Sequence, residues 1–185
     1  MLAFVILLQI ALLAALFFFL LRAVKFAASA ASDAPFVPTP PAFAQAVLHA
    51  LEATDGDVVY DLGSGDGRLL LRCAKLLPGA RFVGIEQSRT LHLIALLRKL
   101  LAGNPRNMRF QRGDLFASDF SGATKIYAYL LASNLARLEP LLARDFRGRL
   151  VSRAFSFKER EPVSGVRLHM REGGHNQHIL YVYDF

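Results

Sequence analysis

The feature that most constrains this chain is a glycine-rich turn between a strand-like and a helix-like segment. The sequence VVYDLGSGDGRLL runs from Val58 to Leu70 and places three glycines at alternate positions after a β-branched and aromatic run. Glycine at such a turn allows backbone conformations with positive φ and lets a ligand approach the main chain. We therefore predict a strand, a ligand-binding loop and a helix in that order.

Strand and helix patterns alternate along the rest of the chain. Expected strands and helices follow one another at 58–62, 67–77, 80–87, 89–102, 108–115, 124–131, 133–146 and 148–157, and two further strands lie at 165–172 and 175–185. The alternation indicates a parallel sheet with helices on both faces, and Gly173–Gly174 indicates a hairpin. The predicted fold class is α/β, a doubly wound, mostly parallel seven-stranded sheet with a C-terminal antiparallel hairpin.

Local sequence adds detail to the helices. Thr39 before Pro40 is typical of an N-cap with proline at the first helical position, so a helix is expected from there to about Ala53. The helix 133–146 is expected to bury Leu135, Leu138, Leu142 and Phe146. In the helix 89–102, helical spacing unites Leu93, Ile94, Leu97, Leu100 and Leu101.

The chain begins with a long apolar segment. Residues 2–21 contain no charge and one polar residue, Gln9. In a helix, twenty residues at about 1.5 Å each reach the roughly 30 Å of a bilayer core. A cleaved signal peptide is the alternative, with AASAAS at 27–32 as a cleavage site, but no basic residue precedes the run and the run is long for that role. We therefore predict an N-terminal transmembrane helix.

The prediction divides the chain into three parts. Residues 1–25 form a single-pass transmembrane anchor, residues 26–38 form a linker rich in Ala, Ser and Pro, and residues 39–185 form one folded domain. Arg22 and Lys25 follow the apolar segment, so the positive-inside rule places the folded domain on the cytoplasmic side. The expected localisation is the membrane.

Charge and cysteine content exclude several classes of protein. The net charge is +7, but the basic residues are scattered and their longest run is the pair Arg98–Lys99, so no nucleic-acid stripe is predicted. A cationic domain beside anionic lipid explains the charge. One cysteine, Cys73, excludes a disulfide and predicts a buried apolar role. His175 and His178 do not converge on a strand, so no metal site is predicted.

The spacing of the glycines distinguishes between ligands. A P-loop needs Lys-Ser/Thr after the glycines, whereas Arg68-Leu69 follow Gly67 here. A dinucleotide fingerprint is G-x-G-x-x-G, whereas this loop is G-x-G-x-G with Asp66 at the helix start. A carboxylate there opposes a phosphate but tolerates a cationic group. The pattern favours S-adenosyl-L-methionine, which carries a sulfonium and an ammonium and has no phosphate.

Two further acids follow the next two strands. Glu86 ends the second strand, 21 residues after Gly65, where a carboxylate can accept both ribose hydroxyls. Asp114, in GDLF, ends the third strand, where it can accept a hydrogen bond from an adenine amino group. Since the carboxyl ends of parallel strands share one edge of a sheet, this ordered set predicts a cofactor site.

These segments resemble a known family. DLGSGDGR, GIEQS and GDLF resemble motifs of class I, seven-strand S-adenosylmethionine methyltransferases, over about residues 36–185. PFVPTP, YAYLLASNLARLEPLL and SRAFSF are similar to small members that include the membrane-anchored protein-lysine methyltransferases acting on the ATP synthase c-ring protein and on adenine nucleotide translocase, with bacterial relatives. The resemblance implies a FVPTP segment over the cofactor, at the substrate entrance. The cofactor-binding residues predicted from the motifs are Asp61, Gly63, Ser64, Gly65, Asp66, Gly67, Glu86, Gln87, Asp114 and Leu115.

The methyl acceptor is less constrained. A lysine amine, with a pKa of about 10.4, must lose a proton before it attacks the methyl group, and an aromatic ring stabilises nearby cations. Tyr129 is the catalytic candidate for that ring. DNA amino-methylation is disfavoured because YLLASN replaces the usual Asn/Asp-Pro-Pro-aromatic sequence. We predict methylation of a lysine in a membrane-associated protein. A lipid or quinone methyltransferase and a non-catalytic cofactor-binding assembly factor remain alternatives.

Overall fold

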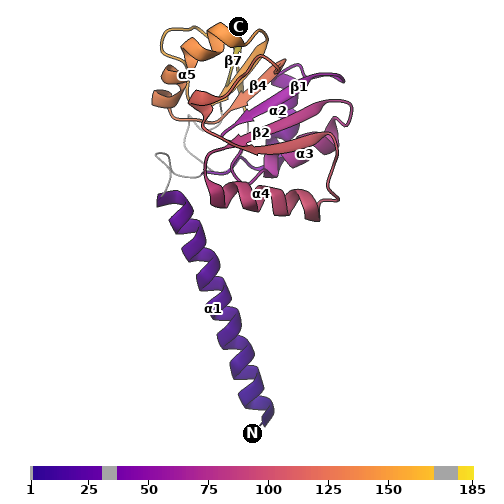
Figure 1. Ribbon diagram of the computed structural model, residues 1–185, viewed down its shortest axis with the longest axis vertical. Helices are drawn as coiled ribbons and strands as arrows, with labels where there is room; N and C mark the ends of the chain where they lie inside the picture. The colour runs from indigo at the N-terminus through magenta and orange to yellow at the C-terminus, as the bar shows by residue number, and fades with distance from the viewer. Residues whose placement is uncertain (1, 31–36, 169–178) are drawn as a thin grey trace. The chain divides into compact units, whose positions relative to one another are not determined.

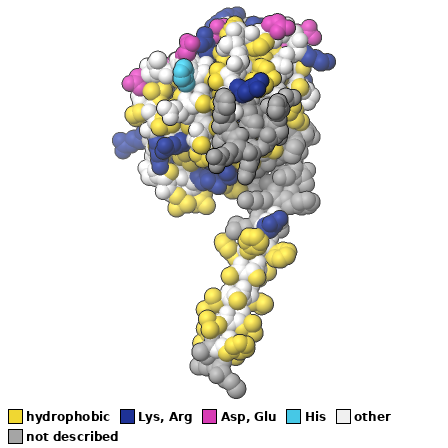
Figure 2. All heavy atoms as spheres, turned by 180° about the vertical axis from the view of Figure 1, so that it is seen from behind, with side chains coloured by type: hydrophobic (Ala, Val, Ile, Leu, Met, Phe, Trp, Pro, Cys, Tyr) yellow, Lys and Arg dark blue, Asp and Glu magenta, His cyan; other side chains and the backbone are white. Residues whose placement is uncertain are grey.

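The computed structural model describes residues 2–30, 37–168 and 179–185, and the chain divides into two compact units, Met1–Phe36 and Val37–Phe185. The first unit contains one helix, α1, Leu2–Ala30 (Figure 1). Its described large apolar side chains, from Phe4 to Leu20, are exposed (Figure 2). No helix within the described part of the chain is long and apolar enough to cross a membrane, so the predicted transmembrane span has no support from the structure.

The second unit is built on a seven-stranded sheet with the strand order β3-β2-β1-β4-β5-β7-β6. Strands β1 to β5 are parallel, and β7 pairs antiparallel with both β5 and β6. This confirms the predicted mostly parallel sheet with an antiparallel end, although the Gly173–Gly174 turn lies outside the described residues. The strands are β1 Val58–Leu62, β2 Arg81–Glu86, β3 Met108–Arg112, β4 Lys125–Ala128, β5 Arg149–Arg153, β6 Ser164–Arg167 and β7 Ile179–Asp184.

Helices cover both faces of the sheet because strand side chains alternate between two cores. Val59 of β1 packs with η1 (Pro41–Phe43), α2 (Ala44–Ala50), α3 (Arg68–Leu76) and α4 (Arg89–Leu101). Tyr60 and Leu62 pack on the other face with η2 (Leu115–Ala117) and α5 (Ala132–Asp145). The predicted burial of α5 is confirmed, with Leu135, Leu138, Leu142 and Phe146 fully buried. Cys73 is buried in α3 as predicted.

The leucine group of α4 lies on the solvent side of the helix. Leu91 and Ala95 are its buried residues, whereas Leu93 and Leu97 are both 56% exposed and Leu100 and Leu101 are 65% and 78% exposed. Helical spacing shows which side chains share a face but not whether that face meets the core. The core contact of α4 is therefore made by a narrower stripe than its leucine content suggests.

Two predicted boundaries are wrong. The helix after Thr39 begins as the 3-10 turn η1, whose N-cap is Pro40 without a side-chain cap, and α2 ends at Ala50. Thr39 is instead buried, and its hydroxyl bonds to distant side chains. Strand β5 ends at Arg153 and not at 157, because Ala154 has a φ of 68°, outside the extended region.

Candidate active site at the carboxyl ends of the central strands

The glycine loop links the end of β1 to the start of α3 and is hydrogen-bonded to β2. The N–H groups of Gly63 and Ser64 donate to the Ile85 carbonyl at 2.9 and 3.0 Å. All three loop glycines have positive φ, 76° at Gly63, 57° at Gly65 and 74° at Gly67. A Cβ atom at Gly67 would also lie 2.3 Å from the Phe110 ring. The loop therefore has the backbone conformation that the sequence predicted, and only glycine fits at Gly67.

Glu86 joins the glycine loop to the start of α4. Its Oε2 accepts a hydrogen bond from the Gly65 N–H and its Oε1 accepts one from the Ser88 N–H, both at 2.8 Å. Ser88 is in turn the N-cap of α4, accepting from the Leu91 N–H at 3.4 Å. Each carboxylate oxygen keeps further capacity to accept hydrogen bonds. Glu86 thus lies where the sequence predicted, beside the loop.

Asp61 places a second carboxyl group close to Glu86. It is 4% exposed at the end of β1, and burial, followed by the charge of Glu86, raises its pKa to about 7. Two nearby carboxylates in a partly dry site disfavour each other's charge, and a cation between or beside them relieves this cost. This donor set suits a ligand with amine and hydroxyl groups, and S-adenosyl-L-methionine carries both.

Asp66 departs from the argument made on the sequence. It is 5% exposed and accepts two hydrogen bonds from the Arg68 Nε, at 2.9 and 3.0 Å, while Arg98 lies 3.3 Å away. Two guanidinium groups offset its charge, so it does not by itself oppose a phosphate. Asp61 and Glu86 carry that electrostatic argument instead, and contact between Asp66 and the cofactor stays a prediction.

The remaining predicted cofactor residues lie at the ends of β2 and β3, which are paired through Glu86 and Arg112. Gln87 is exposed directly after β2. Asp114 is the N-cap of η2, and its Oδ1 accepts from the Phe116 N–H at 3.0 Å. Leu115 is buried. The structure therefore brings the predicted residues to one edge of the sheet, while their individual contacts with cofactor stay predictions.

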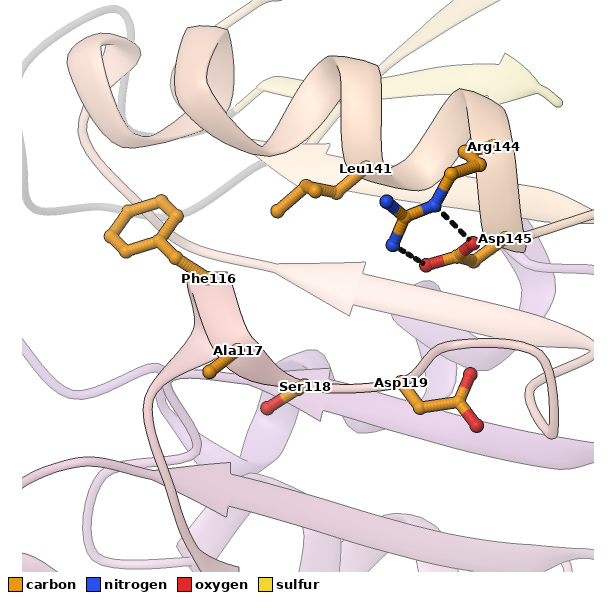
Figure 3. Close-up of a pocket in the computed structure, with 7 residues that line it drawn as sticks. All are labelled: Phe116, Ala117, Ser118, Asp119, Leu141, Arg144 and Asp145. Atoms are coloured by element: carbon orange, nitrogen blue, oxygen red, sulfur yellow. Dashed lines mark hydrogen bonds and ion pairs between the residues drawn. The ribbon is translucent and has the colours of Figure 1, made fainter.

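A hollow of about 370 Å³ between η2 and α5 is a separate feature (Figure 3). Arg144 and Asp145 on its α5 side bind each other through two hydrogen bonds of 2.7 Å. It contains none of the predicted cofactor residues. Its lining residues are Phe116, Ala117, Ser118, Asp119, Leu141, Arg144 and Asp145. We therefore place the cofactor at the glycine loop and not in this hollow.

Arg153 is a site residue that the sequence analysis did not identify. It is 4% exposed at the end of β5, and its Nη1 donates to the Thr39 Oγ1 at 3.0 Å. Thr39 Oγ1 also lies 3.1 Å from the Tyr127 hydroxyl, and burial raises the pKa of Tyr127. These bonds tie the segment 37–43 to the carboxyl ends of β4 and β5. The available signal was an arginine at the end of an apolar strand, since such residues are rarely buried without partners.

The same guanidinium group lies over two aromatic rings. It is 4.4 Å from the ring centroid of Tyr129 and 4.8 Å from that of Phe43. A second cation, such as a sulfonium or an acceptor amine, would have to use the opposite face of Tyr129. The predicted role of Tyr129 is therefore untested, and Arg153 is its immediate cationic neighbour.

Comparison with known proteins agrees with this geometry. The model of the ANTKMT methyltransferase domain family matches residues 61–164, more than half of the chain. A protein-lysine N-methyltransferase of Saccharolobus islandicus (strain REY15A) is 30% identical over 153 residues, which cover 80% of this chain and 92% of that protein. The Homo sapiens lysine N-methyltransferase that is named for the c-type chain of ATP synthase is 28% identical over 130 residues, 69% of this chain but only 54% of that protein.

Solved structures with bound S-adenosyl-L-homocysteine share the fold. An RNA methyltransferase from Salinibacter ruber is 35% identical with a TM-score of 0.71, over 80% of this chain and 93% of that chain. An S-adenosylmethionine-dependent methyltransferase from Geobacter sulfurreducens is 25% identical with a TM-score of 0.56, over 70% of this chain and 53% of that chain. Together with the glycine loop and the paired acids, these matches place the chain in the ANTKMT methyltransferase family, as an S-adenosyl-L-methionine-dependent methyltransferase.

Proposed function

We propose that this methyltransferase modifies a lysine side chain of a membrane-associated protein. The observation that carries the proposal is the 30% identity to a protein-lysine N-methyltransferase over 92% of that protein's length. The further matches to ATP synthase lysine N-methyltransferases of Xenopus laevis, Caenorhabditis elegans and Homo sapiens support the same acceptor group. The chain spans about half the length of these three proteins, so their substrate is not transferred to it.

The proposed reaction is a displacement at the methyl carbon of the sulfonium. The lone pair of the neutral lysine nitrogen forms the new N–C bond, and the C–S bond breaks with its electron pair on sulfur, giving S-adenosyl-L-homocysteine. The amine must first lose a proton to solvent, because an ammonium has no lone pair. In this proposal the lysine enters beside Tyr129, where the buried positive charge of Arg153 favours the neutral amine.

The membrane part of the proposal assigns α1 as an anchor. It is supported by the sequence, which carries no charge from Leu2 to Leu21, beyond the stretch of described side chains. The exposed large apolar side chains of α1 also need a non-aqueous environment. Arg22 and Lys25 follow this stretch, which favours a cytoplasmic location for the catalytic unit.

The test is transfer of an isotope-labelled methyl group to a membrane fraction, followed by identification of the labelled molecule. We expect label on a lysine of a membrane protein, with none when Glu86→Ala replaces the wild type. Label in the lipid extract would instead show a lipid or quinone methyltransferase. Cofactor binding without any transfer would show an assembly factor.

RNA is a second candidate acceptor, because the Salinibacter ruber structure with 35% identity is an RNA methyltransferase. The same experiment therefore includes total RNA beside the membrane fraction. Ribonuclease treatment before counting separates the two acceptors. Label that is lost with ribonuclease would overturn the lysine proposal, whereas label that survives it and is released by protease supports the proposal.

A further inference from the structure

The solvent side of α4 carries an apolar patch that no described segment of the second unit covers. The leucine face, as we call it, has exposed fractions from 40% to 78% and consists of Leu93, Leu96, Leu97, Leu100 and Leu101. These positions follow a helical spacing of three and four residues and so form one stripe. The other exposed large apolar side chains described between 37 and 185 are Val37, Leu76, Val163 and Val166. The leucine face is thus a patch and not a set of isolated residues, and such patches mark interaction surfaces.

Basic residues surround this face, and acids are missing from the same part of the sequence. No Asp or Glu occurs from Gln87 to Gly113, whereas the same stretch contains Arg89, Arg98, Lys99, Arg106, Arg109 and Arg112. All of these are exposed except Lys99, which is half-buried. On the face shown in Figure 2, acidic side chains gather at the end of the unit away from that where Figure 1 draws α4.

We propose that the leucine face of α4 docks onto an anionic lipid surface. Leucine side chains would enter the interface between headgroups and acyl chains, and the flanking arginines would contact the anionic headgroups. This inference rests on the proposed function in taking the methyl acceptor to lie at a membrane. A second copy of the chain fits less well, because two α4 helices packed face to face would bring Arg98 and Lys99 near the same residues of the other copy.

Docking through α4 would bring the active site to the lipid surface. The helix begins at Arg89, three residues after Glu86, and Glu86 itself binds the N–H of Ser88 at the helix N-cap. The edge of the sheet that carries the cofactor residues therefore adjoins the start of the docking helix. An acceptor side chain near the headgroups would reach this edge without leaving the membrane surface.

The experiment measures the depth of α4 in a bilayer with the full chain. A fluorophore is attached to cysteine in Leu97→Cys, the chain is reconstituted into vesicles, and quenching by nitroxide-labelled lipid is recorded. Val163→Cys is the matched control, because Val163 is 59% exposed and Leu97 is 56% exposed. The native Cys73 is buried and burial raises its thiol pKa, so it does not compete for the label.

We expect quenching at position 97 to exceed that at position 163 by about twofold or more in vesicles of phosphatidylcholine and phosphatidylglycerol, and to fall without phosphatidylglycerol or at high salt. Equal quenching at both positions would overturn the proposal. Energy transfer between labels at position 97 of two copies, with no quenching by lipid, would also overturn it and identify self-association.

A second measurement links docking to catalysis. The double variant Leu97→Glu/Leu101→Glu should lower methylation of a membrane-embedded acceptor by about tenfold, since charge on this face opposes its entry into lipid. It should bind S-adenosyl-L-homocysteine like the wild type, and Val163→Glu should change neither quantity. Wild-type methylation by the double variant, with its cofactor binding intact, would contradict the role of docking. The quenching measurement needs no acceptor, so a failure of the proposed function leaves its result interpretable.

Discussion

Glu86 has two tasks that a single substitution removes together. Its two oxygens accept the N–H groups of Gly65 and Ser88, so it fixes the glycine loop and the start of α4 before any ligand arrives. The same carboxylate is the predicted ribose acceptor. Asp114 offers a comparison, because it also accepts a backbone N–H, from Phe116, and is predicted to contact the neutral adenine amino group.

Glu86→Ala should weaken binding of S-adenosyl-L-homocysteine strongly. Loss of a charge-assisted acceptor is worth on the order of 2–3 kcal/mol, or about 30- to 150-fold in dissociation constant. Calorimetry measures this, with Asp114→Ala expected to cost less. A Glu86 variant that binds within tenfold of the wild type would show that the carboxylate does not hold the ribose, and a thermal unfolding curve excludes misfolding as the cause of a larger loss.

Asp61 makes cofactor binding depend on pH. Its pKa of about 7 in the free protein means that much of it is protonated at neutral pH, whereas a bound cation favours the carboxylate. The complex then holds fewer protons, so affinity should rise as the pH rises from about 6 to about 8. Calorimetry in two buffers of different ionisation enthalpy should detect the released proton. A flat profile in the wild type, like that expected of Asp61→Asn, would disprove the coupling.

The same pKa has an effect of opposite sign on the stability of the free protein. The pKa of Asp61 is raised by folding, so the folded state binds the proton more tightly than the unfolded state, whose pKa is about 3.9. Below about pH 4 both states are protonated and Asp61 has no effect. Stability from this group is lost as the pH rises from about 4 through 7, and added cofactor should restore it.

At the scale of elements, the segment 37–43 is held by the cluster of Thr39, Tyr127 and Arg153. Thr39→Val keeps the shape of the side chain but removes the hydroxyl that bonds to both partners, at 3.1 and 3.0 Å. Removing one partner of buried polar groups costs about 1–3 kcal/mol. We expect a matching loss in the free energy of unfolding in urea and faster hydrogen exchange over 37–43. Thr90→Val on α4 is the control, and an equal loss there would refute a specific role for the cluster.

The sequence predicted elements better than it predicted their surroundings. The glycines, Glu86 and Asp114 were found because strand ends and glycine spacing are local patterns. Arg153 was missed because its importance depends on Thr39, a residue 114 positions away. The solvent position of the α4 leucines and the ion pairs of Asp66 were missed for the same reason, since both depend on which elements pack together.

At the scale of the whole molecule, the catalytic unit carries its own core. The buried residues of both core clusters begin at Phe43 and include none from α1. A chain starting at Val37 should therefore fold and bind S-adenosyl-L-homocysteine like the full chain, but methylate intact membranes more slowly, because a tether raises local concentration. Rates on intact and detergent-solubilised membranes test this. Equal rates of both chains on intact membranes would refute tethering by α1.

The strand order also has a consequence for biosynthesis. Strand β6 is made before β7, yet β7 lies between it and the rest of the sheet, so β6 has no sheet neighbour among the described strands until β7 arrives. The four residues of β6 are all exposed even in the finished fold. On the ribosome, β1 to β5 can therefore assemble around the glycine loop while β6 waits. The cofactor site, whose predicted residues all precede β4, is complete in sequence before the sheet closes.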